Sequence, residues 1–119
     1  MSKRILIVDD SPIIHKMLRK TLETNGYQVC GDAKNGLEGY ELYKQLSPDI
    51  VFMDITMPVL DGIGAVKKIF EFNSEAKIVM LTAMADEEIM DEARGLGIEV
   101  FLKKPFDDYK IVSAISSVL

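Results

Sequence analysis

Apolar residues along this chain form two kinds of segment: short continuous runs, and longer stretches in which they recur every three or four positions. The short runs are rich in Ile, Val, Leu and Met, which is typical of strands buried on both faces of a sheet. The run at 50–53 lies between Pro48 and Pro58 and ends at Asp54. Five strands are therefore expected, at residues 4–8, 28–31, 50–53, 77–82 and 100–103.

The longer stretches predict five amphipathic helices. The first begins at Ser11-Pro12, with serine as the N-cap and proline in the first turn, and ends at Asn25-Gly26. The second ends before Pro48, the third covers 62–72, the fourth begins at the acidic residues 86–88 and is capped by Gly97, and the last begins at 107–108. The inner faces are expected to carry Ile14, Met17, Leu18 and Leu22; Leu42, Tyr43 and Leu46; Ile63, Val66, Ile69 and Phe70; Ile89, Ala93 and Leu96; and Ile111, Ile115, Val118 and Leu119.

Strands that alternate with helices in this way predict an α/β fold, because right-handed crossovers produce a parallel sheet with helices on both faces. For five strands the expected arrangement is the doubly wound, flavodoxin-like order 2-1-3-4-5, with its switch point between the first and third strands. The sequence contains no repeat, linker or low-complexity segment, so residues 1–119 are expected to form one domain.

Composition and charge exclude several classes of function. The 119 residues carry a net charge of −5 without a basic run, so direct nucleic-acid binding is not expected. The apolar stretches are too short to span a membrane, and the first is too short for a signal peptide. A lone Cys30 within an apolar strand predicts a buried residue and a reducing, cytoplasmic setting. His15, the only histidine, lies beside the apolar stripe of its helix and is expected to be exposed.

Polar side chains follow four of the expected strands where each one ends. Asp9 and Asp10 follow the first strand, Asp54 follows the third, Thr82 ends the fourth and Lys104 follows the fifth. The carboxyl ends of these strands share one edge of the sheet, where open α/β folds bind ligands. Three carboxylates beside one ammonium need a cation, and an all-oxygen ligand set suits Mg²⁺.

This set of residues predicts a metal-assisted phosphoryl acceptor. Asp54 is expected to be the nucleophile and Asp10 a direct metal ligand, with Asp9 bound directly or through water. Lys104 would offset charge on the phosphoryl oxygens, and the Thr82 hydroxyl would donate a hydrogen bond to one of them. Strand alternation points Lys103 to the opposite face, and Asp61 is expected to start the third helix rather than bind metal.

The chain resembles the receiver domain of bacterial and archaeal response regulators, of the single-domain chemotaxis type. The resemblance rests on motifs in the right order over nearly the whole chain: Val8-Asp9-Asp10, Met53-Asp54-Ile55-Thr56-Met57-Pro58, Asp61-Gly62, Thr82-Ala83 and Lys103-Lys104-Pro105-Phe106. It implies that Asp54 accepts a phosphoryl group from a phosphohistidine of a sensor kinase. It also implies that the Thr56 carbonyl completes the Mg²⁺ shell and that the Lys104–Pro105 bond is cis.

The resemblance further implies a conformational switch. Thr82 would move toward the phosphoryl group while the aromatic ring of Phe101 turns inward; the family often has tyrosine there, so only ring burial can report the switch here. Met84 occupies a position that tunes phosphoryl lifetime in the family, with simple loop packing as the alternative. A downstream target, such as a flagellar switch or relay protein, would bind Ile89, Met90, Phe101 and the outer face of the last helix. The protein is expected to be a monomer and not a conventional enzyme, since it would catalyse only its own phosphorylation and dephosphorylation.

Other functions fit the residues of this chain less well. Asp54 alone could be an ordinary strand-end aspartate. A dehalogenase-like phosphohydrolase needs a second aspartate where this chain has Thr56, and a flavodoxin-like carrier needs an anion-binding loop where it has Asp9-Asp10. Two alternatives remain open: a docking module of the receiver fold that works without phosphorylation, and a receiver fragment of a larger transcriptional regulator.

Overall fold

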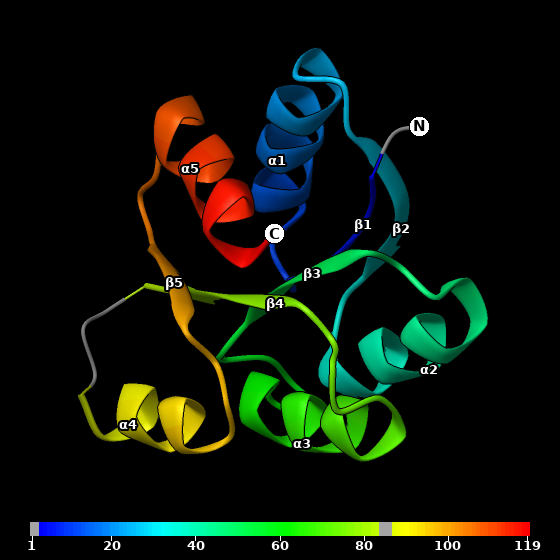
Figure 1. Ribbon diagram of the computed structural model, residues 1–119, viewed down its shortest axis with the longest axis vertical. Coiled ribbons are helices and arrows are strands. Elements are labelled where there is room, and N and C mark those ends of the chain that lie inside the picture. The colour runs from blue at the N-terminus through cyan, green and yellow to red at the C-terminus, as the bar shows by residue number, and fades with distance from the viewer. Residues whose placement is uncertain (1–2, 84–86) are drawn as a thin grey trace.

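The computed structural model describes residues 3–83 and 87–119, and within them strands and helices alternate along the chain (Figure 1). The strands are β1 (Arg4–Val8), β2 (Gln28–Ala33), β3 (Ile50–Asp54), β4 (Ile78–Thr82) and β5 (Val100–Lys103). The helices are α1 (Pro12–Thr24), α2 (Gly36–Leu46), α3 (Gly62–Phe72), α4 (Glu87–Gly95) and α5 (Asp108–Val118). The predicted alternation of strands and helices is therefore confirmed.

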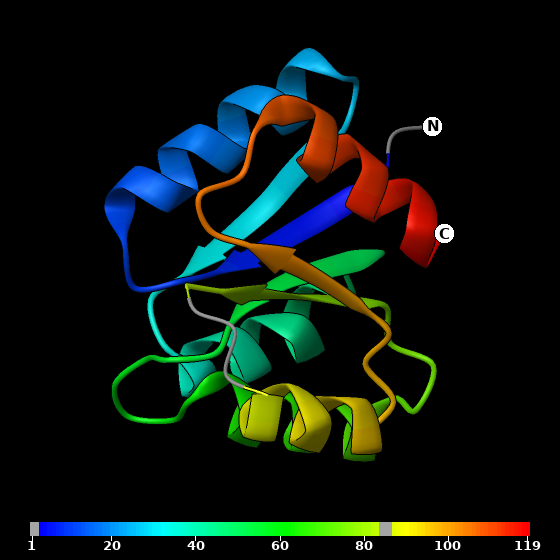
Figure 2. The ribbon, with the colours of Figure 1, turned by 90° about the vertical axis from the view of Figure 1, so that its left-hand side faces the viewer.

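The strands form one parallel sheet in the order β2-β1-β3-β4-β5, as predicted. Helices α1 and α5 cover one face, and α2, α3 and α4 cover the other (Figures 1 and 2). Every residue of β3 and β4 is buried, because these inner strands have neighbours on both sides and helices on both faces. This double burial explains why their sequences are continuous apolar runs.

Alternate residues of each strand enter two separate cores. On the face covered by α1 and α5, Ile5 and Ile7 pack with Leu18 and Ile111. On the opposite face, Leu6 and Val8 pack in a cluster with residues of α2 and α3, including Tyr43 and Ile69. Two packed layers hold the sheet rigid, so the carboxyl ends of its strands are fixed relative to one another.

Strand β2 is longer than predicted. The sequence suggested an end at Gly31, but β2 continues to Ala33, which pairs with Val8. The strand lies at the edge of the sheet, so the polar Asp32 is tolerated within it and hides the strand pattern. The register shifts between Ile5 and Leu6, and the extra length brings Asp32 to the rim beside the end of β1.

Three details at helix ends and edges also differ from prediction. Ser11 stands at the N-cap of α1, but its backbone amide makes the local hydrogen bond, to Oδ1 of Asp9 at 2.8 Å. Leu119 follows α5 and is half exposed rather than buried, since the helix ends at Val118. Cys30 is half-buried, because β2 is an edge strand, and this burial raises the pKa of its thiol.

Other helix ends agree with the sequence. Gly26 has a φ of 87° after α1 and Gly97 a φ of 110° after α4, as expected for left-handed helix stops. Glu87 and Glu88 occupy the first turn of α4, while Asp86 and Met84 lie outside the described residues. Within the described ranges, no helix is long and apolar enough to cross a membrane.

Candidate functional site

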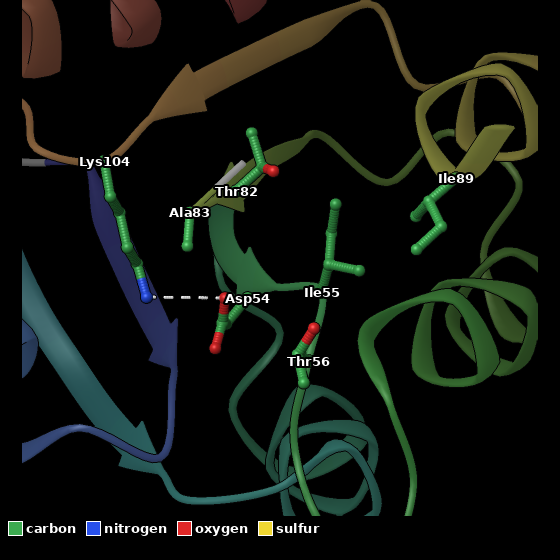
Figure 3. Close-up of a pocket in the computed structure, with 7 residues that line it drawn as sticks. All are labelled: Asp54, Ile55, Thr56, Thr82, Ala83, Ile89 and Lys104. Carbon is green, nitrogen blue, oxygen red and sulfur yellow. Dashed lines mark hydrogen bonds and ion pairs between the residues drawn. The ribbon is translucent and has the colours of Figure 1, made fainter. Parts of the chain in front are cut away.

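The carboxyl ends of β1, β3, β4 and β5 bring the predicted polar residues together at one edge of the sheet. Figure 3 shows Asp54, Thr82 and Lys104 around one pocket. Lys104 Nζ lies 2.9 Å from Oδ2 of Asp9 and 3.4 Å from Oδ1 of Asp54. Asp9 is fully buried, and Asp54 and Thr82 are each only 6% exposed. A buried carboxylate at the end of β3 is thus paired with an ammonium group from the loop that follows β5, a strand two places away in the sheet.

The three acidic residues are close enough to share one cation. One carboxylate oxygen from each of Asp9, Asp10 and Asp54 lies within 4.8 Å of the others. Asp9 and Asp54 are buried, whereas Asp10 is exposed and faces solvent at the rim. An all-carboxylate cluster with one open side fits a hard divalent cation such as Mg²⁺, which binds through one or two carboxylates and retains water.

Electrostatics favour a cation at this position. Burial, and after it the charge of Asp9, raise the pKa of Asp54 from 3.8 to about 6, although Lys104 opposes the change. Burial alone would lower the pKa of Lys104, but its hydrogen bond to Asp9 and the charges of Asp54 and Asp9 raise it overall. Lys104 therefore stays cationic and still leaves the cluster with excess negative charge.

A pocket of about 320 Å³ opens above Asp54. Figure 3 shows the walls of this pocket. They come from the loop after β3, the end of β4, the loop after β5 and helix α4. The pocket is lined by Asp54, Ile55, Thr56, Thr82, Ala83, Ile89 and Lys104. It combines an apolar wall with a carboxylate, an ammonium and two hydroxyl side chains, so with a cation to offset the acidic cluster it can hold a small anionic group against Asp54.

The loop from β3 to α3 is held close to the backbone of Asp54. A Cβ atom on Gly62 would lie 2.1 Å from the Asp54 carbonyl oxygen, so only glycine fits there. Gly62 donates its amide to the Ile55 carbonyl at 2.7 Å, and Asp61 accepts from the Gly64 amide at 2.8 Å. Asp61 is thus the N-cap of α3, as predicted, and the start of this helix is packed against the end of β3.

The remaining predicted residues surround this centre. Thr56 is exposed in the loop that lines the pocket, and Lys103 is exposed on the side away from Lys104. The Lys104–Pro105 peptide bond is cis, as the resemblance implied. Phe101 is half-buried, and the guanidinium carbon of Arg94 lies 5.2 Å from its ring centroid. The structure thus places these predicted residues around Asp54 or on strand β5, and their functional roles stay predictions.

The expectation that His15 is exposed was wrong. Its side chain is 15% exposed, its Nε2 lies 2.6 Å from the Asp9 carbonyl oxygen and its Nδ1 lies 2.8 Å from Asp32 Oδ1. Side chains on a helix lean toward its N-terminus, so a residue in the first turn of α1 covers the loop before it. This tilt of helical side chains, together with the acidic pair Asp9-Asp10 five and six residues earlier, could have indicated that His15 contacts the loop after β1.

Comparison with known proteins places the chain in a family. A model of the response regulator receiver domain matches residues 5–116, so the chain belongs to the response regulator receiver domain family. It is therefore a signalling regulator of the two-component type. The resemblance of the sequence to a receiver domain is confirmed.

Individual relatives are named as chemotaxis proteins. The chain is 44% identical to chemotaxis protein CheY of Thermotoga maritima over 118 residues, which cover 99% of this chain and 98% of the relative. It is 42% identical to chemotaxis protein CheY of Halobacterium salinarum over 119 residues, which cover 100% of this chain and 98% of the relative. In the crystal structure of the CheX–CheY–BeF3–Mg²⁺ complex from Borrelia burgdorferi, one chain matches with a TM-score of 0.93 and 34% identity, over 98% of this chain and 88% of that one.

Proposed function

We propose that this chain is a chemotaxis-type response regulator that accepts a phosphoryl group on Asp54 from the phosphohistidine of a sensor kinase. The observation that carries the proposal is the buried Asp54 carboxylate at the floor of a pocket, 3.4 Å from the Lys104 ammonium and beside Asp9 and Asp10. The similarity to chemotaxis proteins over nearly the whole chain supports the chemotaxis assignment. Residues 1–119 would act as one receiver domain in the cytoplasm.

The transfer step uses groups that the structure brings together. An Asp54 carboxylate oxygen attacks the donor phosphorus, a P–O bond forms, and the P–N bond breaks with its electron pair left on the imidazole. Lys104 offsets the negative charge on the phosphoryl oxygens, and the Thr82 hydroxyl at the end of β4 donates a hydrogen bond to one of them. The product is an acyl phosphate on Asp54. The protein would catalyse only the gain and loss of this group.

The acidic cluster would hold Mg²⁺ through Asp9, Asp10 and Asp54, with the main-chain carbonyl of Thr56 completing the set. Support comes from the carboxylate oxygens within 4.8 Å of one another and from the raised pKa of Asp54. When bound, the cation neutralises charge and orients the phosphoryl oxygens. The solved Borrelia complex, whose name includes BeF3 and Mg²⁺, belongs to the same fold.

Phosphorylation would bias an existing equilibrium between two conformations. Thr82 and Phe101 lie on neighbouring strands, where Thr82 pairs with Lys103 and Phe101 with Met80. Inward rotation of the half-buried Phe101 ring would break its contact with Arg94 and alter the surface of α4 and β5. A downstream protein would then bind Ile89, Met90, Phe101 and the outer face of α5, where Tyr109 is 80% exposed. The receiver itself would remain a monomer.

The proposal is tested by intact-mass spectrometry after incubation with acetyl phosphate and Mg²⁺. The wild type should gain one phosphoryl group, and Asp54→Asn should gain none. Asp61→Asn is the matched control, since asparagine keeps the N-cap of α3 and the pocket carboxylate is untouched. Labelling should also disappear in a chelator.

Two results would contradict this proposal. Phosphorylation of Asp54→Asn to the wild-type level would show that the acceptor is another residue. A folded wild type that binds Mg²⁺ but gains no phosphoryl group would instead favour a docking module that works without phosphorylation.

A further inference from the structure

His15 lies between two oxygen atoms that come from different parts of the fold. Its Nε2 is 2.6 Å from the main-chain carbonyl oxygen of Asp9, at the end of β1. Its Nδ1 is 2.8 Å from a carboxylate oxygen of Asp32, on the edge strand β2. A carbonyl oxygen only accepts hydrogen bonds, so Nε2 of His15 is the donor in the first contact.

The hydrogen bond from His15 completes the anchoring of Asp9. The Asp9 amide donates to the Ala33 carbonyl at 3.0 Å, which ties it to β2. Its carboxylate accepts from the Ser11 amide at 2.8 Å and from Lys104 Nζ at 2.9 Å. With the carbonyl held by His15, the amide, the carbonyl and both carboxylate oxygens of Asp9 all have partners.

The ring of His15 is itself held in place. One carboxylate oxygen of Asp32 accepts a hydrogen bond from Nδ1, and the other accepts from Arg19. Arg19 also lies 3.5 Å from Glu23 on the next turn of α1. The imidazole therefore cannot rotate freely, and the donor Nε2 stays directed at the Asp9 carbonyl.

The Asp9 carbonyl and the Asp10 amide belong to the same peptide group. The orientation of this peptide group therefore sets the position of Asp10. We propose that His15 is a positioning residue: it fixes the Asp9–Asp10 peptide and thereby aims the exposed Asp10 carboxylate at the cation site. The inference rests on the proposed function, because it concerns the acidic cluster through which Mg²⁺ would bind. Replacing a group that hydrogen-bonds a metal ligand from behind typically lowers metal affinity by about 10- to 100-fold.

A purely structural role for His15 makes a different prediction. If the ring only joined α1 to the sheet, its loss would lower stability without a specific effect on the cation. If the ring positions Asp10, its loss lowers Mg²⁺ affinity even in a fully folded protein, and a side chain that keeps the donor restores it.

Three variants separate these roles. His15→Leu replaces the ring by an apolar side chain without a hydrogen-bond donor, while His15→Gln keeps an N–H donor. Thr24→Leu, at the exposed far end of the same helix, is the matched control. Isothermal titration with Mg²⁺ should show about tenfold weaker binding for His15→Leu. Binding by His15→Gln and Thr24→Leu should stay close to that of the wild type.

A second readout needs no metal. Hydrogen bonding to a carbonyl changes the amide nitrogen shift of the following residue, so the ¹⁵N signal of Asp10 reports the contact directly. It should move in His15→Leu and return toward the wild-type position in His15→Gln. Urea unfolding of each variant shows how much of the protein is folded during the titrations.

Each outcome decides the question. Unchanged Mg²⁺ affinity in folded His15→Leu, or equal losses in His15→Leu and His15→Gln, would overturn the inference and leave the proposed function intact. A wild type that binds no Mg²⁺ would overturn the proposed function and this inference with it. If His15→Leu fails to fold, the ¹⁵N NMR spectrum of the His15 imidazole in the wild type still tests the inference. An Nε2 without a proton at neutral pH cannot donate to the Asp9 carbonyl and would overturn it.

Discussion

Replacing Asp54 by asparagine should stabilise the metal-free protein although it destroys the proposed acceptor. The Asp54 carboxylate is buried beside Asp9, and its pKa is raised from 3.8 to about 6. A tenfold change in an acid dissociation constant corresponds to about 1.4 kcal/mol, so ionised Asp54 destabilises the folded state at neutral pH by about 3 kcal/mol. The asparagine amide must find its own hydrogen bonds, which reduces the expected gain to about 1–3 kcal/mol.

The sign of the pH dependence follows from the raised pKa. Between pH 3.8 and about 6 the folded state binds more protons at Asp54 than the unfolded chain does. The destabilising effect of the ionised Asp54 carboxylate is therefore absent below this range and develops as the pH rises through it. The stability advantage of Asp54→Asn over the wild type should grow from almost nothing near pH 4 to its full value near pH 7.

Urea unfolding in a chelator, repeated across this pH range, measures the effect directly. Asp61→Asn serves as the control for an exposed aspartate in the same loop. Saturating Mg²⁺ should then stabilise the wild type more than Asp54→Asn, since a ligand that binds only the folded state adds to its stability. The reasoning is refuted if Asp54→Asn is no more stable than the wild type at pH 7, or if the difference does not depend on pH.

Three further substitutions test other parts of the site and its support, each by urea unfolding in a chelator. Lys104→Met should destabilise by about 3 kcal/mol, because it leaves the fully buried Asp9 without its cation; a loss near zero would contradict this pairing. Val59→Asn should raise the free energy of unfolding by about 1 kcal/mol, because Val59 has a φ of 70°, which is unfavourable for β-branched residues. Its side chain is 77% exposed, so little packing is lost. Lower stability of the variant would show that the Val59 side chain makes a stabilising contact. Gly62→Ala should lower the free energy of unfolding by about 2 kcal/mol or more, because its Cβ would clash with the end of β3. Gly95→Ala is the control, since it has open space around it and should be neutral or slightly stabilising. Equal effects of the two substitutions would contradict the packing argument.

Much of the fold could be predicted because the inner strands have only one kind of environment. β3 and β4 are buried on both faces, and a short continuous apolar run in the sequence is typical of such a strand. The helix α3 begins and ends where the sequence indicated, since Asp61 and Gly62 mark its start strongly. The order of the strands followed from the alternation of elements and the handedness of the crossovers.

The errors fall where a residue has neighbours from distant parts of the chain. The end of β2 was missed because Asp32 is polar, and only its pairing with β1 makes that segment a strand. The position of His15 was missed because periodicity reports which side of a helix faces the core, and His15 instead faces a loop and an edge strand. The Ser11 side chain was expected to cap α1, but Asp9 accepts from the Ser11 amide instead.

The candidate site was easier to predict than these details. Asp10, Asp54 and Lys104 lie at or just after the carboxyl ends of strands, and parallel strands bring these ends to one edge of the sheet. Distances and burial could not be predicted, because they depend on the twist of the sheet and on the loops. The sequence did not reveal that Lys104 would contact both Asp9 and Asp54.

The central claim, phosphoryl transfer to Asp54, is tested most directly by borohydride reduction of the protein after incubation with a phosphodonor and Mg²⁺. Borohydride reduces an acyl phosphate to an alcohol, so a phosphorylated aspartate is recovered as homoserine and can be located by peptide mass spectrometry. The account predicts homoserine at position 54, and its absence when Mg²⁺ is chelated. Reduction at another aspartate, with Asp54 unchanged, would contradict the account.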